Sequence, residues 1–393
     1  MSSVGASPLQ WPAYDQEQID AVVKALQSGR VNYWTGQEGR DFEKEFSAWC
    51  GSNHSIAVAN GTVSLQLIVL ALGLQPGDEV ITTPRTFVAS SSAMVLAGLK
   101  PVMADICQDS GNITPETVAP HITAKTKAIL PVHLGGWPCD MPGFCDLVEG
   151  KGIHLIEDCA QSHGAKIKGR HLGTFGIANS WSFCQDKIMT TGGEGGMVTC
   201  DDEELWKKMW ALKDHGKNFD TVYKKQHPPG FRWLHEDWGT NWRMTEIQSA
   251  LGRVQLRRMD EWHEARKFNA LYMAERLSNL EALRIPEVPS DVTHAWYRLY
   301  AYTRPEALKE GWNRDRIAAE CQAKGFGVVV GSCSEIYLEK CFTNSGMGPA
   351  ERLPNARFLG ENSLAFLTHP GRTTAEMDRE LDILESVVKE ATR

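Results

Sequence analysis

The amino-acid sequence predicts an α/β fold in which a mostly parallel sheet forms a large domain and a smaller α+β domain follows. Short apolar runs alternate with helical patterns between residues 54 and 200. This alternation is typical of a parallel sheet covered by helices. A long helical pattern then leaves this region, and a mixed segment of strands and helices closes the chain. The length of 393 residues allows two such domains.

Seven apolar runs predict the strands of the large domain. They are rich in valine and isoleucine and apolar on both faces, as strands inside a sheet are. The expected strands are 54–59, 79–83, 101–106, 128–134, 153–158, 180–184 and 196–200. Helices are expected between several of them, at 62–73, 86–98 and 140–151.

A helical pattern from 245 to 278 predicts the connection between the two domains. It begins with Thr245 and Gln248, which have the spacing of a capping box. We therefore expect a large domain over 1–250 and, over 251–393, a connecting helix with the small domain. The small domain is expected to contain strands at 296–302 and 327–331, a helix at 313–324 and two closing helices.

Composition and charge exclude several classes of protein. With 41 basic and 49 acidic residues the formal charge is −8, which argues against a nucleic-acid partner. The ten cysteines form no CxxC pair, which argues against zinc or thioredoxin-like sites and favours a reducing cytoplasm. The first 18 residues do not resemble a secretory signal, and the most apolar stretch, 64–74, is too short to span a membrane.

The segment 214–242 predicts a long loop with a function. It contains Pro-Pro, three tryptophans and three histidines, and shows no clear period. Loops of this length without secondary structure are usually functional. It could be a surface insertion without a role, but its aromatic content favours a loop that packs against something.

The first candidate site is ANGTVSL, 59–65, where a strand ends and a helix begins. Free backbone N–H groups and the helix dipole at such a junction favour a phosphate, and the Thr62 hydroxyl would add a donor beside Gly61. The alternative is an ordinary helix N-cap.

Two more candidates follow later strands. Asp158 closes an apolar strand, and a buried carboxylate is costly unless it meets a cation or donors; the alternative is a helix cap. Lys187 follows the strand at 180–184 and precedes four glycines within five positions. A lysine there can react with a carbonyl cofactor, and Ser182 could add a phosphate donor. The alternative for Lys187 is an ordinary solvent-facing lysine.

Together the three features are the parts that hold pyridoxal phosphate: a phosphate site, an acid for the pyridine nitrogen and a lysine for the aldehyde. The sequence contains no GxxxxGK[ST] motif, no GxGxxG after a strand and no GxSxG. Nucleotide hydrolases, dinucleotide-binding proteins and serine hydrolases of the α/β type therefore lack support. No metal site is expected.

Several motifs in order resemble the DegT/DnrJ/EryC1/StrS sugar aminotransferases. The resemblance extends from about residue 10 to the C-terminus and rests on GTVSL, TPRTFVAS, VHLGGWPCDM, IEDCAQSHGA, SFCQDKIMTTGGEGGMV and GTNWRMTEIQSALG. It implies the fold type I of pyridoxal-phosphate enzymes, which is that of aspartate aminotransferase. It also implies a homodimer with shared active sites.

The resemblance assigns roles to individual residues. Lys187 matches the lysine that binds the cofactor covalently, and Asp158 matches the acid at the pyridine nitrogen. Phe87 matches the aromatic residue stacked on the ring, and Gln161 the residue near its 3-hydroxyl. The matches to phosphate contacts are Gly61, Thr62 and Ser182, and Asn241 matches an asparagine that reaches the partner's phosphate.

The resemblance also implies the reaction, transfer of an amino group from an amino acid, glutamate by analogy, to an oxo sugar. A branch of the family has histidine in place of the lysine and catalyses dehydration, so Lys187 favours transamination. The implied acceptor is a nucleotide-linked keto sugar used for amino-sugar and surface polysaccharide biosynthesis.

Two departures from the family pattern concern the acceptor. GSCSEIY, 331–337, replaces the usual histidine and tyrosine, and Gly136-Trp137 replaces a usual glycine-glutamine. These changes leave room for an unactivated oxo sugar acid of the 8-amino-3,8-dideoxy-octulosonate type, used for lipopolysaccharide. Less favoured alternatives are a pyridoxal-phosphate-dependent dehydratase and a cofactor-binding regulator without turnover.

Overall fold

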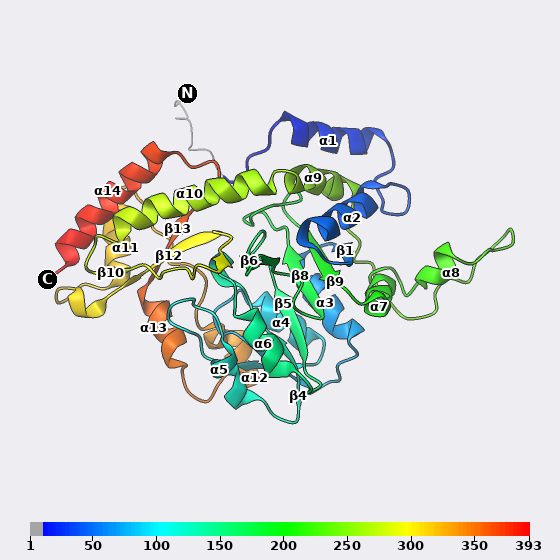
Figure 1. Ribbon diagram of the computed structural model, residues 1–393, viewed down its shortest axis with the longest axis horizontal. Helices are drawn as coiled ribbons and strands as arrows, with labels where there is room; N and C mark the ends of the chain where they lie inside the picture. The colour runs from blue at the N-terminus through cyan, green and yellow to red at the C-terminus, as the bar shows by residue number, and fades with distance from the viewer. Residues whose placement is uncertain (1–10) are drawn as a thin grey trace.

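A computed structural model describes residues 11–393 of the chain. The first ten residues, on which part of the expectation about a secretory signal rests, lie outside the described range. The main sheet has seven strands in the order β1-β9-β8-β5-β4-β2-β3 (Figure 1). Its strands are β1 (His54–Val58), β2 (Glu79–Thr82), β3 (Lys100–Met103), β4 (Thr126–Leu130), β5 (His154–Asp158), β8 (Ala178–Ser182) and β9 (Gly196–Cys200).

This sheet is mostly parallel, as predicted. The pairs β8–β5, β5–β4, β4–β2 and β2–β3 are parallel, while β9 runs antiparallel between β8 and β1. The carboxyl ends of β1, β8, β5, β4 and β2 therefore lie along one edge, together with the start of β9. Ligands bind at this edge in open α/β sheets.

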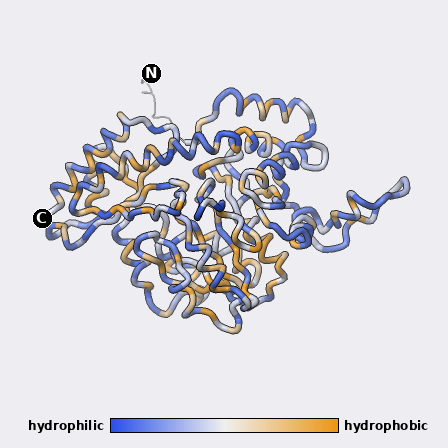
Figure 2. The backbone as a smooth tube through the Cα atoms, viewed as in Figure 1, coloured by the Kyte–Doolittle hydropathy of each residue, from blue (hydrophilic) through white to orange (hydrophobic). Residues whose placement is uncertain are grey.

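Helices cover both faces of the main sheet. The residues buried against one face come from α3 (Gly61–Ala71), α4 (Ala89–Leu96) and α7 (Glu203–Lys213). The other face packs against α2 (Glu38–Cys50), α5 (Pro115–Val118) and α6 (Met141–Val148). Figure 2 shows apolar segments gathered inside the body of the molecule. Both faces are thus buried, which explains the apolar runs of the strands.

A second sheet with its own core lies in the C-terminal part. Its strands run in the order β10-β12-β13 and pair antiparallel. They pack with α10, α11 and α14 around a separate apolar cluster (Figure 1). The elements are β10 (Leu283–Arg284), β12 (Arg298–Thr303), β13 (Ser363–Leu367), α10 (Met259–Leu277), α11 (Arg314–Ala323) and α14 (Thr374–Ala391). The domain boundary near residue 250 stays a prediction.

Apart from four short 3-10 helices, eight further helices and strands complete the described chain. They are α1 (Gln16–Gln27), α8 (Phe219–Tyr223), α9 (Glu246–Leu256), α12 (Lys340–Ser345), α13 (Pro354–Asn362), β6 (Lys166–Ile167), β7 (Arg170–His171) and β11 (Val292–Thr293). The last three form a small sheet of order β11-β6-β7. None of the helices within residues 11–393 combines the length and apolarity needed to cross a membrane.

Three predictions about the elements differ from the structure. The two closing helices expected after residue 331 are three, α12, α13 and α14, and β13 lies between the last two. The helix expected over 245–278 is two helices, α9 and α10, separated at Arg257 and Arg258, whose guanidinium groups turn to Glu17 of α1. The strand expected over 327–331 is absent from the described fold except for one bridge between Val329 and Ala365. A glycine stands at each end of that run, and Gly331 has φ +91°, which ends the extended conformation.

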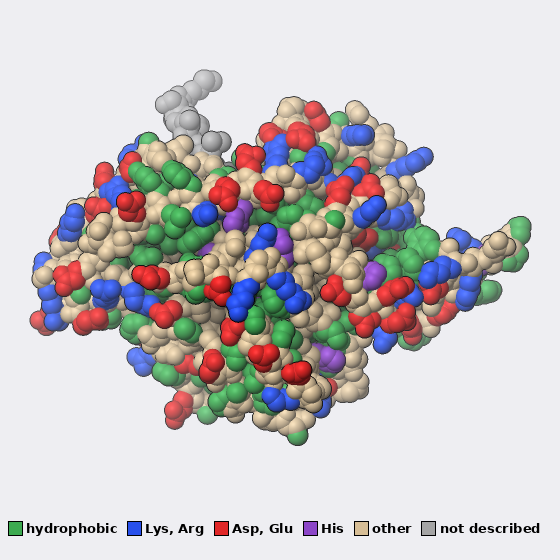
Figure 3. Space-filling view, viewed as in Figure 1, with side chains coloured by type: hydrophobic (Ala, Val, Ile, Leu, Met, Phe, Trp, Pro, Cys, Tyr) green, Lys and Arg blue, Asp and Glu red, His purple; other side chains and the backbone are tan. Residues whose placement is uncertain are grey.

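The segment 214–242 forms an arm that projects from the body (Figure 1). Its base contains α8, where Phe219 and Tyr223 pack against Trp210. Beyond α8 the aromatic side chains are exposed, with Phe231 at 81% and Trp233 at 84% of full accessibility. Figure 3 shows hydrophobic side chains at the tip of the arm. The base thus packs as predicted, while Phe231 and Trp233 at the tip contact each other and remain exposed.

Candidate active site

The end of β1 and the start of α3 form the first part of the site. Asn60 caps α3, and its side-chain oxygen accepts a hydrogen bond of 3.0 Å from the Val63 N–H. Among residues 11–393, no protein acceptor takes the N–H groups of Gly61 and Thr62. Both the cap and the free donors predicted from the sequence are therefore present. These donors at a helix N-terminus suit a phosphate.

Three chain segments pack closely around the N–H groups of Gly61 and Thr62, and we call this concave arrangement the cradle. A Cβ atom added to Gly61 would lie 2.8 Å from the Ser182 Cβ. A Cβ added to Gly196, the first residue of β9, would lie 2.6 Å from the backbone carbon of Asn60. Gly196 is the last glycine of the run after Lys187. Because it has no side chain, the first residue of β9 can pack directly against the backbone of Asn60. Within the run, Gly192 and Gly193 instead adopt positive φ angles of 88° and 118°.

Asp158, at the end of β5, is buried and held by two hydrogen bonds. The Ser90 hydroxyl donates to its Oδ2 at 2.8 Å, and the Ala160 N–H donates to its Oδ1 at 3.1 Å. Burial raises the pKa of Asp158 above its ordinary value, while these two hydrogen bonds and the charge of Lys187 act in the opposite direction. A carboxylate in this setting is stabilised further by a cation, such as a protonated ring nitrogen.

The first turn of α4 and the residues before it reach the same place. Thr86 and Ser90 share a hydrogen bond of 2.9 Å between their hydroxyls, and the Ser90 N–H donates to the Phe87 carbonyl. Phe87 is 69% exposed, so its ring is available to a ligand. It lines an open pocket of about 360 Å³ with Ser332 and Glu339.

Gln161 and Gly135 connect the loops after β5 and β4. The Gln161 Oε1 accepts a hydrogen bond of 2.7 Å from the Gly135 N–H, which fixes the orientation of the amide. With its oxygen occupied in this way, the amide nitrogen of Gln161 is the group left for a ligand.

Lys187 lies in the loop between β8 and β9. Its backbone carbonyl accepts a hydrogen bond of 2.7 Å from the Trp11 indole, which ties the loop to the N-terminal segment. Its ammonium lies 5.4 Å from the centre of the Tyr297 ring and 3.9 Å from the Asp186 carboxylate. Lys187 follows β8, and β8 pairs in parallel with β5 at Asp158, so the two residues lie at the same edge of the sheet.

Asn241 stands apart from this group within the single chain. It lies at the base of the arm, exposed, where its backbone bridges to Asp214. Its side chain makes no hydrogen bond within residues 11–393. The neighbouring Trp242 carbonyl accepts from Ala59 just before the cradle, so the arm begins beside the site.

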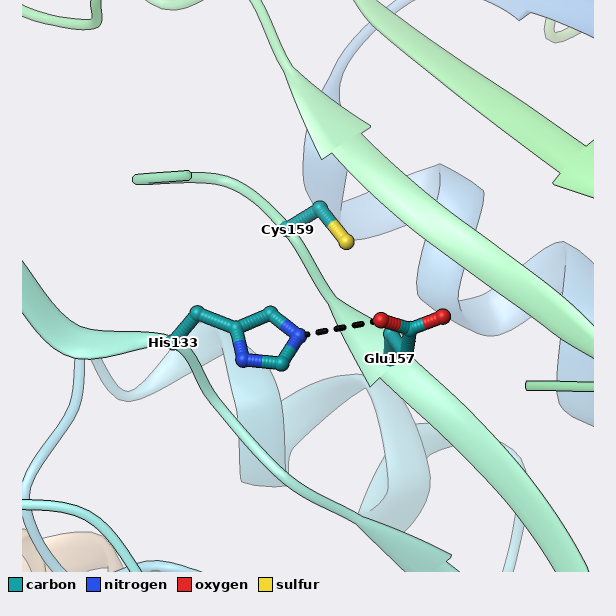
Figure 4. Close-up of side chains that lie close together, drawn as sticks. All are labelled: His133, Glu157 and Cys159. Atoms are coloured by element: carbon teal, nitrogen blue, oxygen red, sulfur yellow. Dashed lines mark hydrogen bonds and ion pairs between the residues drawn. The ribbon is translucent and has the colours of Figure 1, made fainter. Parts of the chain in front are cut away.

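Three ligand-type side chains also converge behind the site, namely His133, Glu157 and Cys159 (Figure 4). The Glu157 carboxylate accepts hydrogen bonds from the N–H groups of Gly173, Phe175 and Gly176 and bonds to the His133 Nε2 at 3.2 Å. His133 Nδ1 in turn accepts from the Cys139 N–H. The carboxylate is therefore occupied by protein donors, and this cluster is a structural network below Asp158.

The structure adds residues that sequence reasoning missed. The Ser90 hydroxyl and the Ala160 N–H orient Asp158. Ser90 could have been found, because Thr86 and Ser90 are four residues apart and so lie on one face of a helical turn after the predicted strand. Free donors, a buried acid and an amine at one sheet edge fit pyridoxal phosphate.

Comparisons with known proteins agree with this geometry. The sequence model of the DegT/DnrJ/EryC1/StrS aminotransferase family matches residues 12–385. The spore coat polysaccharide biosynthesis protein SpsC of Bacillus subtilis is 32% identical, covering 98% of this chain and 97% of that protein. The dTDP-3-amino-3,4,6-trideoxy-alpha-D-glucose transaminase of Streptomyces venezuelae is 31% identical, covering 95% and 92%.

A solved structure gives the same result. The crystal structure of the aminotransferase from Psychrobacter cryohalolentis superposes with a TM-score of 0.96 at 50% identity, covering 98% of this chain and all of that one. The fold is thus that of the fold type I enzymes, as predicted.

Proposed function

Because the chain belongs to the DegT/DnrJ/EryC1/StrS aminotransferase family and is a sugar aminotransferase that uses pyridoxal phosphate, we propose that Lys187 is its catalytic lysine. The observation that carries this proposal is that Lys187 follows β8, the parallel neighbour of the strand β5 that ends at the buried Asp158. When bound, the cofactor supplies an aldehyde that takes the amino group and a ring that accepts electrons.

Each residue then has a separate task. The Lys187 Nζ would hold the cofactor between reactions and, once free of it, would carry the proton that moves during transfer. The Asp158 carboxylate, oriented by Ser90, stabilises positive charge at the ring nitrogen. Phe87 would stack on the ring, and the Gln161 amide nitrogen would donate to its 3-hydroxyl.

The phosphate would lie at the start of α3. One subunit would supply three donors to the phosphate. They are the free N–H groups of Gly61 and Thr62 and the hydroxyl of Ser182. The small size of Gly61 and Gly196 keeps the backbone close enough for a small anion to reach these donors.

The acceptor is proposed to be a nucleotide-linked keto sugar and the donor glutamate. Support comes from the Streptomyces relative, whose name specifies a dTDP-linked amino sugar. The open pocket beside Phe87 carries Glu339 and Ser332, groups that suit sugar hydroxyls. An unactivated oxo sugar acid is the second candidate acceptor, and the assay should include it. Mass spectrometry of mixtures with glutamate and each oxo sugar identifies the aminated product.

A homodimer with shared sites is also proposed. Phe231 and Trp233 at the tip of the arm are exposed aromatic residues that contact each other, and such groups mark association surfaces. Asn241 at the base is exposed and available to the phosphate of a second subunit.

The cysteines are all free, which supports the expected reducing compartment.

Mixed dimers test this sharing. Lys187→Ala and Asn241→Ala are each expected to inactivate a homodimer. In a mixed dimer one site combines the intact Lys187 of one subunit with the intact Asn241 of the other. Random reassortment therefore restores about a quarter of wild-type activity, because half the dimers are mixed and half their sites are intact. No restoration would show that Asn241 serves the site of its own chain.

The assignment of Lys187 has a direct chemical test. Borohydride reduction of the cofactor-loaded protein should add the cofactor mass to the peptide containing Lys187. Lys187→Ala should lose this adduct while keeping its fold by circular dichroism. Lys151→Ala, at an exposed lysine, serves as the control and should retain the adduct. An adduct that persists in Lys187→Ala would overturn the assignment.

A further inference from the structure

Tyr300 in β12 lies between the two loops in which the sequence departs from the family pattern. A Cβ atom added to Gly135, which precedes Gly136-Trp137, would lie 2.8 Å from the Tyr300 Cε2. A Cβ atom added to Gly331, the first residue of GSCSEIY, would overlap the opposite edge of the same ring, at Cε1. Both departures therefore pack against one side chain of the C-terminal part.

The Tyr300 hydroxyl also holds the backbone of the second loop. The Ser332 N–H donates a hydrogen bond of 3.2 Å to the hydroxyl oxygen. Further along the loop, the Ile336 N–H donates to the Pro84 carbonyl at 3.0 Å. The loop is thus attached at two points, one on β12 and one on the segment that precedes α4.

Arg85 covers the face of the Tyr300 ring. Its guanidinium carbon lies 4.8 Å from the centre of this ring and 5.5 Å from that of Tyr302, and its Nη1 donates to the Tyr302 hydroxyl at 3.0 Å. The Arg85 side chain is fully buried, and its Nε and Nη2 have no hydrogen-bond partner within residues 11–393. Burying a guanidinium with so few hydrogen bonds is costly, and the faces of the two rings offset part of that cost.

These contacts connect both segments that line the open pocket of about 360 Å³. Phe87 belongs to one segment, two residues after Arg85, and residues 332–341 contribute the other. The first segment is attached to the face of the Tyr300 ring, and the second to its hydroxyl and one edge. Moving Tyr300 would therefore change how far the segment 332–341 lies from the Phe87 ring.

We propose that Tyr300 is a positioning residue for the oxo sugar, because it holds the loop at Ser332 opposite Phe87 and so determines the shape of the pocket. This inference rests on the proposed function. The loop carries small side chains in place of the usual histidine and tyrosine, so its backbone position determines how much room the sugar has. Lys187 lies against Tyr297 instead, which does not line this pocket, so the glutamate half of the reaction should not depend on the loop.

Two exposed cysteines of the pocket measure the position of the loop directly. Cys333 follows Ser332, whereas Cys341 lies in α12. Burial raises the pKa of the Cys333 thiol, and a loop released from the Tyr300 hydroxyl would lose part of that burial. In cofactor-loaded Tyr300→Phe, alkylation of Cys333 by iodoacetamide should therefore be roughly 3-fold to 10-fold faster than in wild type, the effect of one lost hydrogen bond. Alkylation of Cys341, quantified by mass spectrometry of the same digest, should change by less than about 2-fold.

The two halves of the reaction show whether the loop serves the sugar. The probe is the oxo sugar that wild type aminates best. In Tyr300→Phe the concentration of this sugar for half-maximal reaction with the aminated cofactor should rise roughly 3-fold to 10-fold. The glutamate concentration for half-maximal change of cofactor absorbance should remain within about 2-fold of wild type. Tyr272→Phe is the control for both halves, since it removes another tyrosine hydroxyl of the C-terminal part, one that donates to Asp378.

Gly331→Ala tests the packing of the loop on the ring. Its methyl group would overlap the Tyr300 ring, whereas Gly325→Ala places a methyl group in open space. The two glycines have φ angles of +91° and +93°, so the backbone strain is comparable in both variants. Gly331→Ala should impair the oxo-sugar half more than Gly325→Ala does. In a Tyr300→Ala background, which removes the ring, the two substitutions should have equal effects.

The outcomes distinguish the inference from the function on which it rests. If Tyr300→Phe weakens both halves equally or neither, or leaves the alkylation of Cys333 unchanged, the inference is wrong and the aminotransferase assignment stands. A larger loss from Gly331→Ala than from Gly325→Ala in the Tyr300→Ala background would also overturn it, because the ring would not determine the position of the loop. Failure of wild type to react with any amino donor would instead refute the proposed function.

Discussion

The Ser90 hydroxyl donates a 2.8 Å hydrogen bond to the buried Asp158 carboxylate, joining α4 to the end of β5. Phe87 lies just before this helix, and its carbonyl accepts a hydrogen bond from the Ser90 N–H. One turn therefore positions both the acid proposed for the ring nitrogen and the aromatic residue proposed to stack on the ring. Substituting Ser90 therefore changes the hydrogen bonding of Asp158 and leaves the Lys187 side chain in place.

Ser90→Ala should weaken catalysis through Asp158. The lost hydrogen bond is one of the interactions that lower the pKa of Asp158, so the pKa of this carboxyl should rise. The acid limb of the kcat/KM profile should then move to higher pH, with kcat/KM at neutral pH lowered roughly 10-fold. Ser92→Ala, at a half-buried serine of the same helix, is the control. Unchanged profiles in both variants would contradict the prediction.

Gly196→Ala should impair cofactor binding without unfolding the protein. The added Cβ would lie 2.6 Å from the backbone carbon and oxygen of Asn60, so the cradle must move. We expect the cofactor dissociation constant to rise roughly 10-fold or more, measured by absorbance titration. In Gly348→Ala the new Cβ makes only an ordinary contact of 3.5 Å with Tyr337, and affinity should be unchanged. Equal affinities in the two variants would refute the proposed cradle.

Glu157→Gln should lower the free energy of unfolding by about 3 kcal/mol or more. The carboxylate accepts three backbone N–H groups and bonds to His133, and an amide would direct its own N–H groups at some of these donors. Urea unfolding measures the change. Glu149→Gln, at an exposed glutamate, should leave the midpoint in place. A fully stable Glu157→Gln would show that these bonds contribute little.

His163 should make stability depend on pH. It is buried between Trp181 and Phe183, and burial lowers its pKa to about 3. The unfolded chain binds a proton near pH 6.5 and the folded protein does not, so stability is full above that pH and falls as pH decreases towards 3. His163→Leu should reduce the slope by about 1.4 kcal/mol per pH unit between about pH 4 and about pH 6.

A packing control accompanies the histidine variant. Phe183→Leu removes a ring that contacts His163 but no titrating group. Its stability curve should therefore lie below that of wild type and parallel to it. If His163→Leu were also parallel to wild type, His163 would have no part in the acid sensitivity.

Much of the fold could be predicted because its signals are local. Strands buried on both faces are apolar throughout, so β5 and β9 were located almost to the residue. The run 327–331 is also rich in valine, but an extended backbone becomes a strand only when it pairs with a neighbouring strand. Val329 finds only one bridge to Ala365, which depends on a distant partner that the run itself does not specify.

The site was predictable to the same extent. Gly61, Asp158 and Lys187 each follow a recognisable strand end, and the topology brings those ends together. Ser90 is 68 residues from Asp158 in the chain, and Trp11 is 176 from Lys187. Contacts of this kind depend on tertiary packing, so the residues that orient the chemistry could not be derived from short motifs.

The position of β9 between β1 and β8 determines when the cradle can form during synthesis. Asn60 and Gly61 leave the ribosome early, but the strand that packs against them begins only at Gly196. A nascent chain that ends before β9 lacks this wall of the proposed phosphate site, and its β1 has no neighbouring strand in the main sheet. The proposed phosphate site can therefore be complete only after about half of the polypeptide has been translated.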